Sequence, residues 1–462
     1  MKIQKTSDAQ LNFNSQMIDS PKKRSASAQC LGAFQKAIFL AIILSFFSSQ
    51  NAFSGELLQL ITRKEAAPTE TSKSAAQLVP PKADTRKTAG KSDKDLIGMG
   101  PEKKWQIHPG FKFQTTFDSN VNREAPHKRD EEIILSYVPS VTVRRKGAKL
   151  DVSAGYEFNY EEFLRDADQS SFNHIANTNI VYKGDKLTTK IDEQFARVTA
   201  YASSEQSERR TVLANDFRPE VIYRLTPKVS ISSVYRHYIF NYQESAVEDN
   251  SYISNEIGGR VYYHATPKLD FYVQGAGNLF DYYKSGIYDS RGYSILIGSV
   301  GKATDKVILN LQGGFRGQSY DDSTLNSFHG LVVEGILRYR LTRKFHVSIL
   351  GRREKEESVY SNTAFYVSNK LGLEFDYRLT PRVHLNVDGS VQRSHYPRET
   401  TSGTLTKKRR DYIFNSGARI KWYPVRHLNV SAGYSFRERE SNFDNTFDYV
   451  DHVVDTSVSY QL

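Results

Sequence analysis

The stretch YRLTPKV at residues 223–229 decides the fold, because it returns at a nearly constant interval along the chain. Close copies stand at residues 263–269, 339–345 and 377–383, and weaker ones at residues 145–150, 182–187, 302–307 and 422–428. The first apolar residues after these segments are Leu150, Leu187, Val229, Leu269, Val307, Phe345, Val383 and Leu428. Each interval between them is long enough for one strand, one loop and a returning strand.

Between these segments, apolar and polar residues alternate. In the first such run Trp105, Ile107, Phe111, Phe113 and Phe117 share one parity. A period of two places successive side chains on opposite faces of a strand, so each strand has one apolar and one polar face. The chain also contains 28 Tyr and 26 Phe, which favour strands and populate the aromatic girdles of membrane barrels.

Long polar segments alternate with the short turns. They include residues 118–131, 165–171, 202–210, 244–250, 353–362 and 398–410. Short turns at one end and long loops at the other are typical of outer-membrane barrels, whose short turns are periplasmic. Eight turns separate nine strand pairs, so we predict an all-β, transmembrane, antiparallel up-and-down barrel of about 18 strands (16–18). A β-propeller fits less well, because each interval holds only two strands.

The N-terminal segment, residues 1–54, is organised like a secretory signal peptide. Basic residues precede the apolar run 37–44, and the small-residue site Ala52-Phe53-Ser54 follows it. Residues 55–104 contain no Tyr, Phe or Trp, so we expect a flexible, disordered periplasmic linker. Residues 105–462 would then form the outer-membrane barrel. An uncleaved anchor is the alternative for the apolar run, and Met17 is an alternative start.

Composition argues against other classes of protein. The mean hydropathy of −0.55 does not fit a helical membrane protein. Most of the net charge of +11 comes from residues 1–104, so the remainder is a poor footprint for nucleic acid. The single cysteine, Cys30, precedes the expected cleavage site, so we expect neither a disulfide nor a lipid anchor in the mature chain.

Motifs for catalysis and metal binding are missing from the sequence. It has no Gly-rich phosphate loop, no H-E-x-x-H, no Cys–His zinc pattern and no G-x-S-x-G. We therefore expect no enzyme activity, no catalytic residue, no cofactor and no metal site. Acidic residues in or near predicted loops could hold Ca²⁺ weakly, although a solvated loop is the more ordinary interpretation: Asp321, Asp322, Glu354, Glu356 and Glu357.

The polar faces of the later strands supply the candidate site residues. If the apolar parity faces lipid, these side chains face the lumen: Glu334, Arg338, Arg340, Lys370, Glu374, Asp376, Arg378, Asn386, Asp388, Arg419 and Lys421. Charges of both signs inside a barrel need water, and a barrel of this size leaves an aqueous channel. The alternative is that the charges pair and plug the lumen. Residues 187–201 break the alternation at Glu193 and Arg197, which a β-bulge would explain.

Four short motifs carry a resemblance to a known family. The segments HPGF at 108–111, FDSNV at 117–121, Asp130, and YVPSV at 137–141 resemble the opening of a family of outer-membrane β-barrel porins associated with exopolysaccharide export. The resemblance implies a pore in the outer membrane of a Gram-negative-type bacterium, surrounded by outer-membrane lipid. It also implies polysaccharide-export components as partners, and it supplies no catalytic residues.

The predicted function is therefore a porin-like channel for exopolysaccharide or hydrophilic solutes. The last strand, with Val454, Val458, Tyr460 and Leu462 in one parity, resembles the segment that the outer-membrane assembly machinery recognises. One alternative is a structural or adhesion barrel with a plugged lumen and partner-binding external loops. A barrel enzyme acting on lipid or glycan is a third alternative, for which the sequence offers no catalytic constellation.

Overall fold

The computed structural model describes most of the chain after residue 104. The described residues are 105–125, 129–201, 204–205, 209–244, 248–283, 288–358, 363–402, 404–443 and 446–462. The expected signal peptide (1–54) and linker (55–104) lie outside them. Within the described ranges, no helix is long and apolar enough to cross a membrane.

The described residues form eighteen strands and two one-turn 3₁₀ helices. The strands are β1 (Gln106–Asp118), β2 (Glu132–Arg145), β3 (Leu150–Phe163), β4 (Ser171–Lys183), β5 (Leu187–Ala200), β6 (Arg210–Arg224), β7 (Val229–Tyr242), β8 (Tyr252–Thr266), β9 (Leu269–Tyr282), β10 (Ser290–Lys302), β11 (Val307–Tyr320), β12 (Phe328–Arg340), β13 (Phe345–Glu357), β14 (Phe365–Thr380), β15 (Val383–Ser402), β16 (Leu405–Val425), β17 (Leu428–Ser441) and β18 (Tyr449–Gln461). The short helices are Ala167–Gln169 and Glu248–Asn250.

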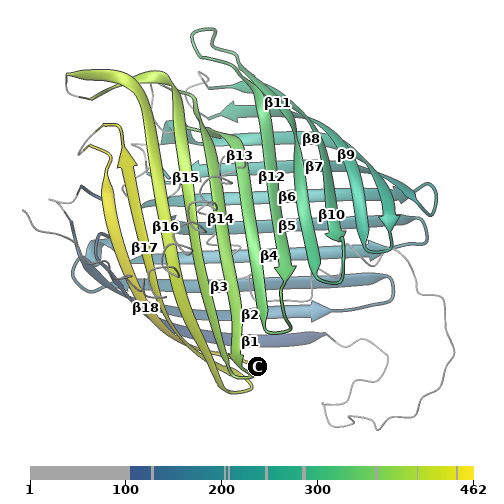
Figure 1. The fold of residues 1–462 in the computed structure, drawn as a ribbon, viewed down its shortest axis with the longest axis horizontal. Helices are drawn as coiled ribbons and strands as arrows, with labels where there is room; N and C mark the ends of the chain where they lie inside the picture. The colour runs from purple at the N-terminus through teal and green to yellow at the C-terminus, as the bar shows by residue number, and fades with distance from the viewer. Residues whose placement is uncertain are drawn as a thin grey trace, which may run out of the picture. The chain divides into compact units, whose positions relative to one another are not determined.

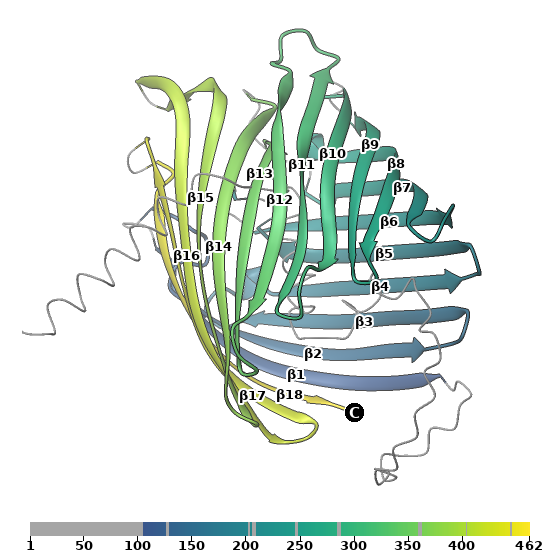
Figure 2. The same ribbon diagram turned by 45° about the vertical axis from the view of Figure 1, so that its right-hand side comes forward.

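The strands close into a barrel. Each strand pairs antiparallel with the next, and β1 pairs with both β2 and β18. In Figure 1 the wall formed by β10–β18 lies in front of the wall formed by β1–β9, and the strands of the two walls cross. Figure 2 shows the same wall continuing from β9 to β10. The prediction of an antiparallel barrel of about 18 strands is confirmed.

The eight short turns lie at one end of the barrel, which we call the turn end; the opposite end is the loop end. All eight strands that follow a turn begin at the predicted apolar residue. In four of the turns, a threonine of the repeat holds the backbone just before this residue. The Oγ1 of Thr226 accepts hydrogen bonds from the backbone N–H groups of Lys228 at 3.2 Å and Val229 at 3.0 Å. Thr304, Thr342 and Thr380 repeat this pair of bonds.

The outer face of the wall is apolar, as the alternation predicts. Ile257, Ile297 and Leu331 expose 66%, 64% and 64% of their surface on this face. The predicted β-bulge in residues 187–201 is wrong, because β5 pairs with β6 without a shift from Leu187 to Ala200. Polar side chains therefore do occur on the outer face, where the guanidinium of Arg197 donates to the carbonyl of Phe172 at 3.1 Å.

Two predicted loops are largely strand. β13 continues to Glu357, and β15 and β16 form a long hairpin with 20 and 21 residues. Residues 353–357, 398–402 and 405–410 are polar because these strand ends leave the lipid-facing wall or extend beyond it, where an apolar outer face has no lipid to contact. Polarity alone could not separate such strand ends from loops.

Candidate functional site

The eleven predicted lumen residues lie on the inner face of β12, β14, β15 and β16. Their neighbours in the Cα register share that face: Glu334 is opposite Arg352, which is opposite Lys370, which is opposite Gln392. The remaining predicted residues lie in neighbouring cross-strand rows of the same face: Arg338, Arg340, Glu374, Asp376, Arg378, Asn386, Asp388, Arg419 and Lys421. The structure thus brings them together as one polar surface.

Several of these side chains hold one another in place. The amide nitrogen of Asn386 donates to carboxylate oxygens of both Glu374, at 3.0 Å, and Asp376, at 2.9 Å. Arg419 forms a bidentate ion pair with Asp455, with both N···O distances at 2.6 Å. Glu334 accepts a hydrogen bond from the amide of Gln312 at 2.6 Å.

The arginines nearest the turn end are more exposed. Arg338, Arg340 and Arg378 are exposed inner-face residues. The guanidinium of Arg340 donates to the backbone carbonyl of Asp305 in the neighbouring turn at 2.8 Å. The guanidinium of Arg338 is 3.4 Å from the hydroxyl of Ser348. This half of the lumen is therefore open to solvent, and its exposed side chains include these three arginines.

Sequence reasoning missed a second charged surface on the inner face of β5–β8. Asp216 pairs with Arg236 at 2.9 Å and with Arg218 at 3.0 Å. Glu220 pairs with Lys190 at 3.0 Å and lies 3.7 Å from Arg260. The same two-residue alternation would have placed the members on β6–β8 inside, because they stand opposite in parity to exposed apolar residues.

At the loop end, β13 leaves the wall. Its pairing with β12 stops at Val333 and Arg353, although β12 continues to Phe328. The guanidinium of Arg353 covers the separation by donating to the carbonyl of Leu331 at 3.1 Å and to Asn369 at 2.9 Å. Residues 354–357 and 365–368 beyond this point, which we call the hairpin tip, remain paired with each other.

The hairpin tip is buried on both faces. Glu354, Glu356 and Glu357 expose 1%, 2% and 4% of their surface, so the interpretation of a solvated loop is wrong for these three residues. Asp321 is exposed and Asp322 partly exposed, in the connection between β11 and β12. Arg316 on β11 forms an ion pair with Glu354. Among the described residues, no group of His, Cys, Asp and Glu is placed to hold a metal ion.

The opposite face of the tip packs against the inner wall. Lys355 forms an ion pair with Glu357 and donates to Gln318 at 3.0 Å and to the Tyr320 hydroxyl at 3.2 Å. The ring of Phe365 lies 6.3 Å from Tyr320 and 5.7 Å from Phe328, in a cluster that includes Leu296 and Val332. Because these partners belong to the inner faces of β10–β12, the tip lies inside the lumen.

A second element reaches across the lumen. Three described residues of the β5–β6 connection form it: Tyr201, Ser204 and Glu205. We call them the crossing segment. The hydroxyls of Ser204 and Tyr366 are 3.0 Å apart, and Ser358 donates to the Glu205 carboxylate at 2.9 Å.

The crossing segment is also tied to the far wall. Arg439 on β17 donates to the backbone carbonyls of Ser204 at 2.9 Å and Glu205 at 3.3 Å. The amide of Gln392 on β15 lies 3.4 Å from the Ser204 hydroxyl. β5 pairs only with β4 and β6, so β14, β15 and β17 lie on the far side of the ring.

The β1–β2 and β17–β18 connections complete this layer. The hydroxyl of Tyr201 donates to the carbonyl of Val121, and the guanidinium of Arg123 lies 3.4 Å from the Tyr201 ring centre. Burial raises the pKa of the Tyr201 hydroxyl, so it stays protonated as a donor. Arg409 pairs with Asp411 at 2.6 Å and lies over the ring of Phe447.

The two halves of the lumen therefore differ. At the loop end, the inward side chains of Arg409, Phe240 and Tyr366 expose 0% of their surface. At the turn end, inward side chains such as Arg338 and Arg378 are exposed. The hairpin tip and the crossing segment fill the loop-end half, which makes it the narrow part of any path through the barrel. We call this layer the loop-end constriction.

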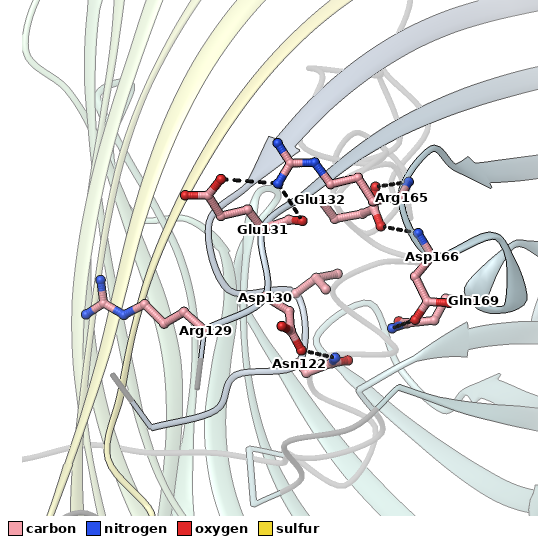
Figure 3. Close-up of a pocket in the computed structure, with 9 residues that line it drawn as sticks. Asn122, Arg129, Asp130, Glu131, Glu132, Arg165, Asp166 and Gln169 are labelled. Atoms are coloured by element: carbon pink, nitrogen blue, oxygen red, sulfur yellow. Dashed lines mark hydrogen bonds and ion pairs between the residues drawn. The ribbon is translucent and has the colours of Figure 1, made fainter. Parts of the chain in front are cut away.

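A polar pocket of about 560 Å³ opens between the β1–β2 and β3–β4 connections. Figure 3 shows Arg165 reaching Glu131, with which it forms an ion pair at 3.2 Å. The carboxylate of Glu132 accepts the backbone N–H groups of Arg165 at 3.0 Å and Asp166 at 2.9 Å. Glu132 thus joins the β1–β2 and β3–β4 connections at the rim, and both of its carboxylate oxygens accept hydrogen bonds there.

Comparison with known proteins identifies the family. The family described as "Putative beta-barrel porin 2" matches residues 103–462. The chain belongs to this family. The recognition of a porin family from the short motifs is confirmed, and so is the location in the outer membrane of a Gram-negative-type bacterium. This porin family is one of channels rather than enzymes.

Solved porin structures match the chain at low sequence identity. The outer membrane protein opdK from Pseudomonas aeruginosa has a TM-score of 0.44 and 9% identity, over 77% of this chain and 99% of that one. Pseudomonas aeruginosa OccK2 (OpdF) in complex with glucuronate has a TM-score of 0.45 and 9% identity, over 78% and 98%. Acinetobacter baumannii OccAB4 has a TM-score of 0.44 and 10% identity, over 77% and 98%. No curated protein matches the chain in sequence.

Proposed function

We propose that this porin is a selective channel for small hydrophilic solutes, with its selection step at the loop-end constriction. The observation that carries the proposal is the set of ties from Ser204 and Glu205 to Tyr366, Ser358 and Arg439. Elements built from the porin's own loops narrow the lumen there, while the turn-end half stays polar and solvent-exposed. A wide pore without such elements would pass solutes with little discrimination.

The lining charges favour small anions among these solutes. Six of the eleven inner-face residues are Arg or Lys and four are Asp or Glu, and Arg338, Arg340 and Arg378 are exposed whereas Glu374, Asp376 and Asp388 are only partly exposed. A lumen whose cationic side chains are more exposed than its acidic ones raises the local concentration of anions. We assign the eleven inner-face residues the role of lining this aqueous path.

Export of an exopolysaccharide remains a prediction from the motifs, and the family description does not mention it. A polymer would need the crossing segment and the hairpin tip to move out of the lumen together. Polysaccharide-export components and the outer-membrane assembly machinery likewise remain proposed partners. The geometry of the constriction favours small solutes over the polymer, because both elements are fixed by buried ion pairs and hydrogen bonds.

Ion selectivity in planar bilayers tests the proposal. Under a salt gradient, the native porin should show a reversal potential of the sign expected for anion preference. The double variant Arg338→Gln/Arg378→Gln should shift that potential toward zero, since exposed cations no longer bias the ion concentration. Substitution of an exposed lysine in a turn, Lys344→Gln, serves as the control. A cation-selective native pore, or an unchanged potential in the double variant, would contradict the proposed lining.

A structural or adhesion barrel is the second candidate, and the full burial of Arg409, Tyr366 and Phe240 favours it. In that case the folded porin carries no current, and partner binding depends on the external loops. Liposome swelling separates the two candidates. Vesicles that contain the folded porin should swell in small sugars or amino acids if it is a channel, and should not swell in any of them if the lumen is plugged.

A further inference from the structure

The outer face of the long β15–β16 hairpin carries a group of basic side chains. Arg393 and His395 lie on β15, and Arg410 lies directly opposite His395 on β16. Lys408 stands two residues before Arg410 on β16 and therefore shares its face, and both side chains are exposed. We call these four residues the basic patch.

Register and exposure place the patch on the lipid-facing side. Arg393 stands opposite Tyr412, and its guanidinium lies 5.8 Å from the Tyr412 ring centre, so both side chains share one face. Tyr412 and Phe414 on that face expose 39% and 37% of their surface, as the apolar band of the barrel does elsewhere. The patch begins where this band ends, toward the loop end.

The cations of the patch lie close together. Arg393, Lys408 and Arg410 are all near enough to His395 to interact with it electrostatically, and no ion pair between a described carboxylate and Arg393 or Arg410 is found. The Nε of Arg393 and the Nδ1 of His395 are buried without a hydrogen-bond partner. Glu399 stands opposite Lys408 and Glu440 stands opposite Tyr412, and these are the nearest acids in register on this face.

We propose that the basic patch binds the phosphate groups of a phosphorylated lipid headgroup in the outer leaflet. The three cations lie at the edge of an apolar, lipid-facing band, at the level where headgroups meet hydrocarbon. The exposed side chains of Lys408 and Arg410 can donate to phosphate oxygens, and arginine suits phosphate because of its planar set of donors. Tyr412 and Phe414 contact the acyl chains below.

Native mass spectrometry of the full-length porin tests this inference, with diphosphorylated lipid A as the probe. The triple variant Arg393→Gln/Lys408→Gln/Arg410→Gln should bind at least about tenfold more weakly, because each basic residue near an anionic surface contributes to binding. Phosphatidylcholine, whose headgroup has no net negative charge, should bind equally to native and variant protein. Heat-modifiable gel mobility shows that each variant barrel is folded.

The matched control is Glu440→Gln, which removes an acid beside the patch and should keep or strengthen lipid A binding. Equal lipid A affinity of the native porin and the triple variant would overturn the inference. Competition by inorganic phosphate alone would also overturn it, because that result indicates a site for the free anion. A dimer that only the native patch supports would assign the surface to a second copy of the chain instead.

Discussion

The ion pair between Lys355 and Glu357 is the residue-scale feature that holds the constriction together. Its side chains are 4% and 5% exposed, and the same lysine donates to Gln318 and Tyr320 on the wall. Two charges taken out of water are tolerated only when each is compensated. Both residues belong to the hairpin tip, and their hydrogen bonds to Gln318 and Tyr320 fix the tip against β11.

Breaking this pair on one side should open the tip. Glu357→Ala leaves the Lys355 charge buried and should destabilise the tip by about 3 kcal/mol, whereas the double variant Lys355→Met/Glu357→Leu should cost far less. Hydrogen exchange at residues 354–357 measures the local opening. Equal exchange in the single and double variants would show that the ion pair does not hold the tip.

Gly301, at the end of β10, has a backbone conformation that residues with a side chain rarely adopt. It has a φ of 126°, and an added Cβ would lie 2.0 Å from the carbonyl oxygen of Lys268. Gly301→Ala should therefore destabilise the barrel by about 1–3 kcal/mol, measured as a lower urea midpoint. Gly275→Ala is the control, because nothing lies within 4 Å of its added Cβ. A midpoint as high as that of the control would contradict the strain argument.

At the scale of the element, the turns were predictable and the constriction was not. The recurring threonine fixes four of the turns through bonds to neighbours two and three residues away, so the signal is local. The hairpin tip depends on Arg316, which is 38 residues from Glu354, and the crossing segment on Arg439, 235 residues from Ser204. Polar residues that find partners so far along the chain look like an exposed loop in sequence.

The threonine turns give a direct test at this scale. Thr342→Val keeps the branched shape but removes the acceptor for the N–H groups of Lys344 and Phe345, and should cost about 1 kcal/mol. Thr342→Ser keeps the acceptor and should cost less. Urea midpoints of the two variants measure the difference. A valine variant as stable as the serine variant would mean that the register of β12 and β13 alone defines the turn.

At the scale of the whole molecule, the two halves of the lumen differ, because side chains at the loop end are buried and those at the turn end are exposed. The inner-face polarity of the barrel could be predicted from alternation along β12, β14, β15 and β16, because Arg338 and Glu374 stand opposite in parity to apolar residues. Which half of the lumen is narrow could not be predicted from the sequence. It depends on where the hairpin tip and the crossing segment fold. We therefore propose that passage through the barrel is controlled at the loop end rather than by the diameter of the eighteen-strand ring.

Single-channel conductance of the native porin and Arg439→Ala tests this account most directly. The substitution removes the donor to the carbonyls of Ser204 and Glu205 and frees the crossing segment from β17. We predict a small conductance for the native porin and a severalfold larger one for the variant, with unchanged heat-modifiable mobility. A native conductance already as large as that of the variant would contradict the claim that the crossing segment narrows the channel.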